Sequence, residues 1–229
     1  MQPNIFMWSG LLKSLLDSDL HIILDVVKAS KNSRYNRNKI RGNQKPTWLT
    51  IPFSGFSRNC LINQLKLETS ISNQEKIFNL FYSRYKNAPF FKTSNFVLEN
   101  TIKTDLPESF LLEIYNQFLN SLRGLEIKIC KTIRASEIIS EETFHNLNGV
   151  DLVNYLLREV NAKTYLASAN TLNYANRSEY IVEKVLIQNF SQSFYDQTIS
   201  GCKEETKFQQ NLSCLDLLSF ISIKNLEKY

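Results

Sequence analysis

The apolar, β-branched run at residues 20–27, LHIILDVV, limits the possible folds more than any other stretch of the chain. It is short for a helix, and its continuous apolar character is typical of a strand that is buried on both faces of a sheet. Residues 10–16, which place leucines on one helical face, precede it, and the polar turn 17–19 separates the two. A helix followed by a buried strand at this spacing predicts half of a βαβ unit, in which sites gather at the carboxyl end of the strand.

The rest of the chain alternates between strand-like and helix-like patterns. Further strands are expected at residues 48–53, 60–67, 127–133, 165–168 and 182–187. Further helices are expected at residues 73–86, 107–124, 148–160 (capped by Asn148) and 213–220, where Ser213 and Asp216 resemble a capping box. Because no internal repeat or linker-like stretch interrupts this alternation, we expect one α/β domain over residues 1–229 with a mostly parallel sheet.

The composition argues against several classes of site. Hydrophobic residues make up 43% of the chain and charged residues 21%, as in ordinary folded domains. Only six glycines are present, which argues against a glycine-rich phosphate cradle. The four cysteines form no CxxC pair, and neither histidine is near one in sequence, so no zinc site is expected. No membrane-spanning run or signal peptide is visible, and a reducing cytoplasm is the expected setting.

One stretch of the chain is strongly basic, against a formal net charge of +5 for the whole chain. After Asp25 no acidic residue interrupts seven cations, which are Lys28, Lys31, Arg34, Arg37, Lys39, Arg41 and Lys45. Such a stretch can bind nucleic acid, a membrane surface or a phosphate-bearing small molecule, and it can also be a solvated loop. The charge pattern alone leaves these alternatives open.

Two candidates for chemistry lie in this first part of the chain. Asp25 follows the apolar run and is therefore expected at a strand end, where a carboxylate can bind a hydroxyl, orient an amine or act as a base. The alternative is an aspartate that only caps a turn. Asn36, Arg37 and Asn38 place two amides around a guanidinium, which can hold a phosphate or a carboxylate in bidentate fashion. A polar surface turn is the alternative for this triplet.

Other candidates are more scattered. Tyr85 and Lys86 can present a phenol and an amine at a helix end, although a cation there often only stabilises the helix terminus. Tyr195 and Gln197 lie in a polar stretch, for which an ordinary surface loop is the alternative. His21, inside the apolar run, is interpreted as a packed histidine. No Ser–His–Asp or Cys–His set can be assembled from the spacing.

A set of short segments carries a resemblance to a known family. In order, they are Gln2-Pro3-Asn4, Phe6, Trp8, Gly10, Ser18-Asp19, Ile23-Leu24-Asp25, Asn36-Arg37-Asn38, residues 48–52 (WLTIP), residues 85–91 (YKNAPFF), residues 165–168 (YLAS), Tyr174, Tyr195-Asp196-Gln197 and residues 212–218 (LSCLDLL). The set covers nearly the whole chain, and its order is more specific than any one piece. The sequence is similar to the WbqC-like family of bacterial proteins.

This resemblance implies an enzyme of surface-polysaccharide (O-antigen type) biosynthesis that modifies a nucleotide-activated amino sugar by acyl or aminoacyl transfer. It implies a Rossmann-like sheet flanked by helices, by fold-level analogy with pantoate ligases. Asp25 would orient or deprotonate the accepting amine, and Arg37 with Lys39 or Lys28 would hold phosphate charge. The substrate site would include Gln2, Asn4, Asn36, Arg37, Asn38, Tyr85, Lys86, Tyr165, Ser168, Tyr174, Tyr195 and Gln197. No cofactor is identified by the sequence, and no metal is expected.

The chain also departs from the family pattern. Met1 takes the place of a family histidine, and the short strand that usually precedes it is missing. Met7 replaces a proline, and Val26 replaces a second carboxylate. Two alternatives to an active transferase therefore stay open. One is a non-catalytic, degenerate member of the family, or a chain whose first strand is encoded upstream. The other is a basic nucleic-acid-binding module, with Tyr35 and Trp48 as stacking residues.

Overall fold

The computed structural model describes residues 1–30, 33–57, 59–147, 149–168, 171, 175–188, 195, 197 and 208–228. The α-helices are α1 (Ser9–Asp17), α2 (Ile71–Tyr85), α3 (Phe91–Ile102), α4 (Leu111–Gly124), α5 (Glu141–His145), α6 (Gly149–Glu159) and α7 (Cys214–Phe220). The strands are β1 (Leu20–Ile23), β2 (Arg37–Ile40), β3 (Thr47–Thr50), β4 (Phe53–Ser54), β5 (Lys66–Glu68), β6 (Glu108–Phe110), β7 (Lys131–Arg134), β8 (Thr164–Ser168) and β9 (Lys184–Gln188). Short 3-10 turns lie at η1 (Ile62–Gln64), η2 (Ala135–Glu137), η4 (Arg177–Glu179) and η5 (Ile223–Lys228).

The described strands form four small sheets. β1 pairs with β7 and β8 pairs with β9, both in parallel. β2 and β3 form an antiparallel hairpin, and β4, β5 and β6 form an antiparallel sheet. The expected mixture of helices and strands with parallel pairing is therefore confirmed. The described strands do not join into the one mostly parallel, Rossmann-like sheet that was expected.

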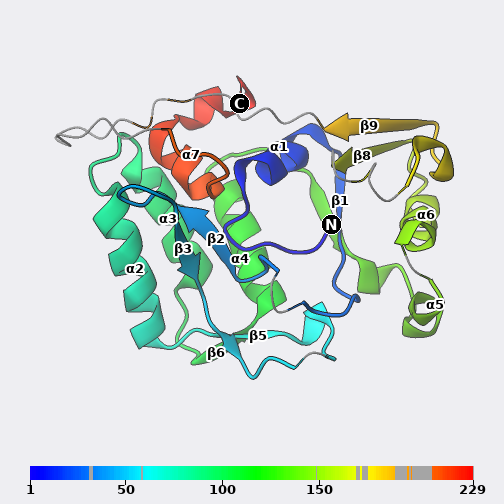
Figure 1. The fold of residues 1–229 in the computed structure, drawn as a ribbon, viewed down its shortest axis with the longest axis horizontal. Helices are drawn as coiled ribbons and strands as arrows, with labels where there is room; N and C mark the ends of the chain where they lie inside the picture. The colour runs from blue at the N-terminus through cyan, green and yellow to red at the C-terminus, as the bar shows by residue number, and fades with distance from the viewer. Residues whose placement is uncertain are drawn as a thin grey trace.

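The main hydrophobic core lies between α1, α2, α3, α4 and α7 and the β2–β3 hairpin (Figure 1). The amphipathic helix α4 turns Ile114, Tyr115 and Phe118 into it, as its heptad-like spacing predicts. A second cluster lies under α5 and α6, and a third joins α6 to β8 and β9 at the right of Figure 1. Among the described helices, none is long and apolar enough to cross a membrane.

Several elements differ from the prediction. Residues 37–40 were expected in a loop and form β2. The helix expected from residue 107 begins at Leu111, because residues 108–110 pair with β5. The segment 60–67 is a 3-10 turn followed by a short strand. Ser213 does cap α7, where its hydroxyl accepts from the Leu215 N–H, but the Asp216 side chain does not complete a capping box. Asn148 lies outside the described residues.

Candidate functional site

Asp25 lies two residues beyond β1, at the carboxyl ends of the parallel strands β1 and β7, and is only 1% exposed. The backbone N–H of Ser136 donates to one carboxylate oxygen at 3.0 Å, and the Ser136 hydroxyl donates to the other at 2.7 Å. Ser136 belongs to η2, which directly follows β7. Asp25 therefore ties the end of β1 to the turn after β7, and both of its oxygens are engaged within the chain.

The Asn36-Arg37-Asn38 triplet is divided by the alternation of β2. Asn36 and Asn38 point inward and are 4% and 0% exposed. The side-chain amide of Asn36 donates to the Ile51 carbonyl at 2.6 Å, and that of Asn38 donates to the Phe6 carbonyl at 2.8 Å. Because successive side chains of a strand point to opposite faces, Arg37 projects outward. The two asparagines hold the hairpin to its neighbours, and Arg37 is left on the outer face.

On this outer face three cations surround a tryptophan, and we call these four residues, Arg34, Arg37, Lys39 and Trp48, the Trp48 patch. The Trp48 indole is 39% exposed. The guanidinium carbons of Arg37 and Arg34 lie 4.8 and 5.9 Å from the centre of its ring, and the Lys39 amine lies 5.6 Å away. The β2–β3 register places Lys39 directly opposite Trp48. Cation–π attraction therefore gathers positive charge around one exposed ring.

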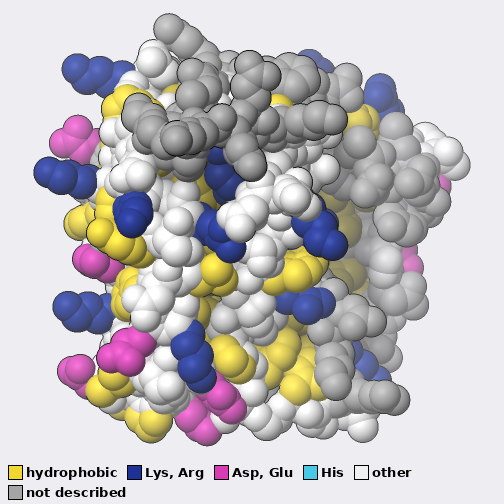
Figure 2. All heavy atoms as spheres, turned by 60° about the vertical axis from the view of Figure 1, so that its left-hand side comes forward, with side chains coloured by type: hydrophobic (Ala, Val, Ile, Leu, Met, Phe, Trp, Pro, Cys, Tyr) yellow, Lys and Arg dark blue, Asp and Glu magenta, His cyan; other side chains and the backbone are white. Residues whose placement is uncertain are grey.

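The cations of the Trp48 patch are not neutralised by ion pairs within the described residues. The ion pairs there, Lys13–Asp17, Lys66–Glu108 and Arg134–Glu137, involve none of them. Figure 2 shows the face that brings the left-hand side of Figure 1 forward, where α2, β2 and β3 lie. Lys and Arg side chains occur across its middle, and Asp and Glu lie mainly toward its left and lower edges. This distribution favours an anionic ligand over a cationic one.

Asn4 and Ile5, before α1, bind the backbone of the segment that carries Arg34. The Ile5 N–H donates to the Tyr35 carbonyl at 2.9 Å. The Asn4 side chain is oriented so that its amide nitrogen donates to the backbone carbonyls of Arg34 and Ile5, both at 2.9 Å. On the other side, the Ser213 N–H donates to the Lys39 carbonyl at 2.7 Å. Asn4 thus contacts backbone in this structure, and Gln2 is exposed beyond it.

A buried carboxylate brings three of the predicted site residues together. We call Arg41, Tyr85, Tyr195, Gln197 and Asp216 the Asp216 cluster; all are between 0% and 5% exposed. The Tyr85 hydroxyl donates to one oxygen of Asp216 at 2.7 Å. The Tyr195 hydroxyl and the Gln197 amide, at 3.1 Å, donate to the other. Burial raises the pKa of the Asp216 carboxyl, and burial beside this carboxylate also raises the pKa of both phenols.

The Asp216 cluster links elements that are far apart in the sequence. The Arg41 N–H, one residue past β2, donates to the Tyr85 hydroxyl at 2.8 Å, and the Arg41 charge acts against the rise in the pKa of Asp216. Next to it, the Gln209 side chain donates to the Gly42 carbonyl at 2.9 Å and accepts from the Gly42 N–H at 3.1 Å. The cluster is buried, and its hydrogen bonds connect the end of the hairpin to α2 and α7.

Asp216 itself was read from the sequence only as part of a cap. Its role becomes clear from its burial, because all seven residues of α7 are buried. A carboxylate in a wholly buried helix requires several hydrogen-bond donors around it. Tyrosine and glutamine side chains elsewhere in the chain supply these donors.

The remaining predicted site residues lie elsewhere. Lys86 is an exposed residue at the end of α2, with its amine 5.6 Å from the Tyr82 ring centre. Tyr165 of β8 packs against Tyr180, with ring centres 5.1 Å apart. The Ser168 hydroxyl is 3.1 Å from that of Thr171. Tyr174 lies outside the described residues. Within the part of the chain that the structure describes, no group of three His, Cys, Asp or Glu residues is placed to hold a metal ion.

His21 of β1 provides a prediction about pH. It is 6% exposed, its Nε2 lies 3.4 Å from the Tyr115 hydroxyl, and burial together with the positive chain terminus lowers its pKa to about 3. Between that value and the unfolded value of about 6.5, only the unfolded chain binds the extra proton, so stability falls as the pH falls. We expect urea unfolding to show that the wild type loses about 2 kcal/mol more than His21→Gln between pH 7 and pH 5. Equal losses in the two proteins would contradict this.

The comparisons with curated proteins and with solved structures gave no match to this chain. The family comparison gave a match that extends from Gln2, through the hairpin that carries the Trp48 patch, to the end of the C-terminal 3-10 turn. Its model, described as the WbqC-like protein family, covers residues 2–228, and the chain therefore belongs to the WbqC-like protein family.

Proposed function

We propose that this protein is an enzyme of surface-polysaccharide biosynthesis that modifies a nucleotide-activated amino sugar by acyl or aminoacyl transfer. In this proposal the Trp48 patch binds the phosphate-bearing part of the substrate. The observation that carries the proposal is the gathering of Arg34, Arg37 and Lys39 around one exposed indole. Membership of the WbqC-like family supports the polysaccharide class.

The chemistry of the patch suits a ligand that has both phosphate and a ring. Arginine guanidinium groups bind phosphate in bidentate fashion, and a lysine amine adds a point charge. An exposed indole can stack on a nucleobase or pack against the apolar face of a sugar ring. The patch stands on the β2–β3 hairpin, whose inner face is fixed by Asn36 and Asn38, so the cations are presented on a supported surface.

The proposal places a parallel, Rossmann-like sheet beside this hairpin, supported by the parallel pairs β1–β7 and β8–β9. It assigns binding to the patch and leaves the transfer step without a named residue. For Asp25 to act as the base, Ser136 would have to release one of its carboxylate oxygens. Tyr85, Tyr195 and Gln197 contribute through the position of the hairpin, because they surround Asp216 in the interior.

Isothermal titration against a panel of nucleotide sugars and free nucleotides tests this function. We expect binding by wild type, and binding that is about 10- to 100-fold weaker in the Arg37→Ala/Lys39→Ala double variant, since two lost contacts of about 0.7–1.4 kcal/mol each amount to about one to two factors of ten. Lys131→Ala, an exposed cation on β7, is the matched control and should bind like wild type. No binding by wild type, or equal binding by the double variant, would rule out the patch as the site.

Two further measurements separate this function from its alternatives. A fluorescent oligonucleotide should show no salt-sensitive binding at low ionic strength, whereas a nucleic-acid-binding module would bind it with an affinity that falls steeply with salt. Turnover of an amino-sugar nucleotide in the presence of an acyl donor supports the transferase. Binding of the nucleotide sugar without any turnover would instead indicate a family member that has lost catalysis.

A further inference from the structure

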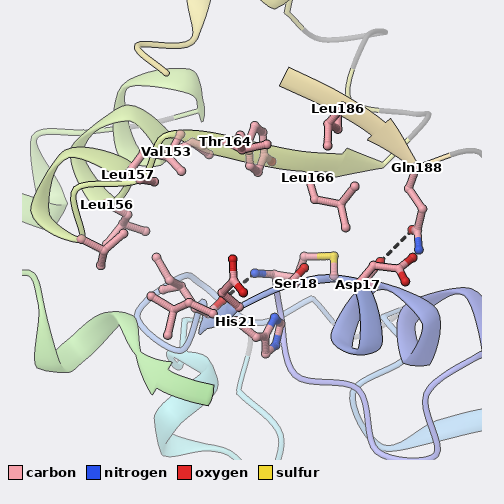
Figure 3. Close-up of a pocket in the computed structure, with 18 of the residues that line it drawn as sticks. Asp17, Ser18, His21, Val153, Leu156, Leu157, Thr164, Leu166, Leu186 and Gln188 are labelled. Carbon is pink, nitrogen blue, oxygen red and sulfur yellow. Dashed lines mark hydrogen bonds between the residues drawn. The ribbon is translucent and has the colours of Figure 1, made fainter. Parts of the chain in front are cut away.

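Two pockets of different character lie beside the β1–β7 pair. The larger, of about 990 Å³, lies between β1 and β8, and Figure 3 shows leucines of α6, β8 and β9 around it. The smaller, of about 300 Å³, lies between α4 and β7, and we call it the β7 pocket. Its polar lining residues are Asn116, Asn120, Arg123, Thr132, Arg134 and Glu137. A small charged ligand therefore suits the β7 pocket better than the leucine-rich cavity.

The polar side chains of the β7 pocket come from two facing rows. Asn116, Asn120 and Arg123 are four and three positions apart along α4, so they share one face of the helix. Thr132 and Arg134 are two positions apart along β7 and share one face of the strand. The Arg123 guanidinium joins the rows, because it donates to the Asn120 side-chain oxygen at 3.1 Å and to the Thr132 hydroxyl at 3.4 Å. The pocket thus has fixed polar walls from two elements.

The backbone of β7 adds hydrogen-bond donors to this pocket. The Lys131 N–H donates to the Asp19 carbonyl at 3.2 Å, on the side of β1. Since the backbone groups of successive residues point to opposite sides of a strand, the N–H groups of Thr132 and Arg134 point away from β1. Among the described strands, none pairs with this outer edge of β7. These two N–H groups are therefore placed to donate to a ligand.

Arg134 carries the positive charge that the β7 pocket offers to a ligand. Its Nε lies 4.0 Å from a carboxylate oxygen of Glu137, and the two side chains are 39% and 59% exposed. A charge-assisted hydrogen bond is much shorter, about 2.7–2.9 Å, so this loose pair leaves the guanidinium able to bind a closer anion. The two parallel N–H donors of a guanidinium match the two oxygens of a carboxylate. Glu137 repels a phosphate dianion more strongly than a carboxylate, so the pocket favours the carboxylate.

We propose that the β7 pocket binds a small molecule through its carboxylate. The Arg134 guanidinium and the outer N–H groups of β7 hold the carboxylate, and Asn116 and Asn120 bind the other polar groups of the ligand. The volume is at the lower end of the range for ligand pockets and suits a molecule of the size of an amino acid or a hydroxy acid. The site differs from the Trp48 patch on the β2–β3 hairpin, and the inference does not depend on the function proposed above.

Isothermal titration with the common amino acids, acetate, lactate and succinate tests this site, with inorganic phosphate as the comparison anion. We expect at least one carboxylate to bind wild type with a dissociation constant below about 1 mM. Arg134→Gln should weaken this binding about 10- to 100-fold, because charge-assisted hydrogen bonds are lost. Arg134→Lys keeps the charge without the paired donors and should weaken it about 3- to 10-fold. Lys92→Ala, an exposed cation on α3, is the control and should bind like wild type.

Glu137→Gln distinguishes the two sources of the carboxylate. An amino acid should bind about 5-fold more weakly to this variant, because its ammonium group loses a charged partner. A simple carboxylate should bind equally well or more tightly, because a repelling charge is removed. Either result supports the proposal and identifies the kind of ligand.

Four results would overturn the proposal. One is that none of these carboxylates binds wild type, and another is that Arg134→Gln binds as well as wild type. The third is that phosphate binds as tightly as the best carboxylate and is lost in Arg134→Gln, which would make the pocket a phosphate site. The fourth is that Arg37→Ala/Lys39→Ala abolishes carboxylate binding, which would assign it to the Trp48 patch. Circular dichroism of each variant shows that a loss of binding is not a loss of folding.

Discussion

Asp216→Ala is expected to lower the free energy of unfolding by about 3–5 kcal/mol, the cost typical of breaking a buried, hydrogen-bonded charge cluster. The substitution removes the acceptor of the Tyr85 and Tyr195 hydroxyls and of the Gln197 amide, in a site that is buried from bulk solvent. It also leaves the Arg41 charge buried beside them. Urea unfolding followed by circular dichroism measures the loss.

Matched variants keep this prediction testable if Asp216→Ala does not fold. Asp216→Asn retains one acceptor oxygen and should lose less, about 1–3 kcal/mol. Tyr85→Phe removes one donor to Asp216 and the acceptor of the Arg41 N–H, with an expected loss of about 1–2 kcal/mol. Asp105→Ala, at an exposed position, should change stability by less than about 0.5 kcal/mol. A loss below about 1 kcal/mol for Asp216→Ala would mean that the cluster does not hold the hairpin.

Asp25→Ala is expected to destabilise the fold by about 2–3 kcal/mol, because both oxygens of a buried carboxylate accept hydrogen bonds from Ser136. Ser136→Ala removes only the hydroxyl donor and should cost about 1 kcal/mol. In the double variant the two losses should not add, since the residues share the contact. Chemical denaturation of the four proteins gives this coupling directly.

The same experiment decides between a structural and a catalytic Asp25. Asp25→Asn keeps an acceptor and should fold with an intermediate stability. If the structural interpretation is right, this variant binds and turns over its substrate nearly as well as wild type. If Asp25→Asn folds and binds nucleotide sugar but shows no turnover, Asp25 acts as the base.

Periodic elements were predictable from the sequence, and elements with polar residues at buried positions were not. The apolar stripes of α1, α2, α4 and α6 identified those helices. α3 was missed because Ser94 and Thr101 occupy core positions and break its apolar period. Their hydroxyls have hydrogen-bond partners: Thr101 donates to the Val97 carbonyl at 2.6 Å, and Ser94 accepts from the distant Ser219 hydroxyl at 2.7 Å. A pattern based on hydrophobicity cannot detect such positions.

The strand β2 was missed for a related reason. Its sequence, RNKI, contains one apolar residue, and its inward position at residue 38 is an asparagine. The interior accepts Asn38 because its amide donates to a backbone carbonyl of the segment before α1. That partner is 32 residues away in sequence, so no local rule reveals it. The division of the triplet into inner and outer residues became visible only with the register of the hairpin.

The candidate site shows the same limit. The sequence singled out Tyr85, Tyr195 and Gln197 individually, and the family resemblance grouped them as substrate residues. Their meeting around Asp216 depends on contacts over 131, 21 and 19 residues of sequence. Such contacts bring Tyr85 of α2, and the distant Tyr195 and Gln197, to Asp216 of α7, and spacing along one chain does not specify them.

The alternation of β2 allows the charge of the outer surface and the stability of the fold to change independently. Asn36 and Asn38 carry the bonds that fix the hairpin, while Arg37 and Lys39 carry charge on the solvent side. Substitutions at 37 and 39 are therefore expected to change the charge of this surface with little loss of thermal stability. Substitutions at 36 and 38 remove bonds from the interior. To change the charge of this surface without loosening the hairpin, the odd-numbered positions of this strand would be varied and the even-numbered ones kept.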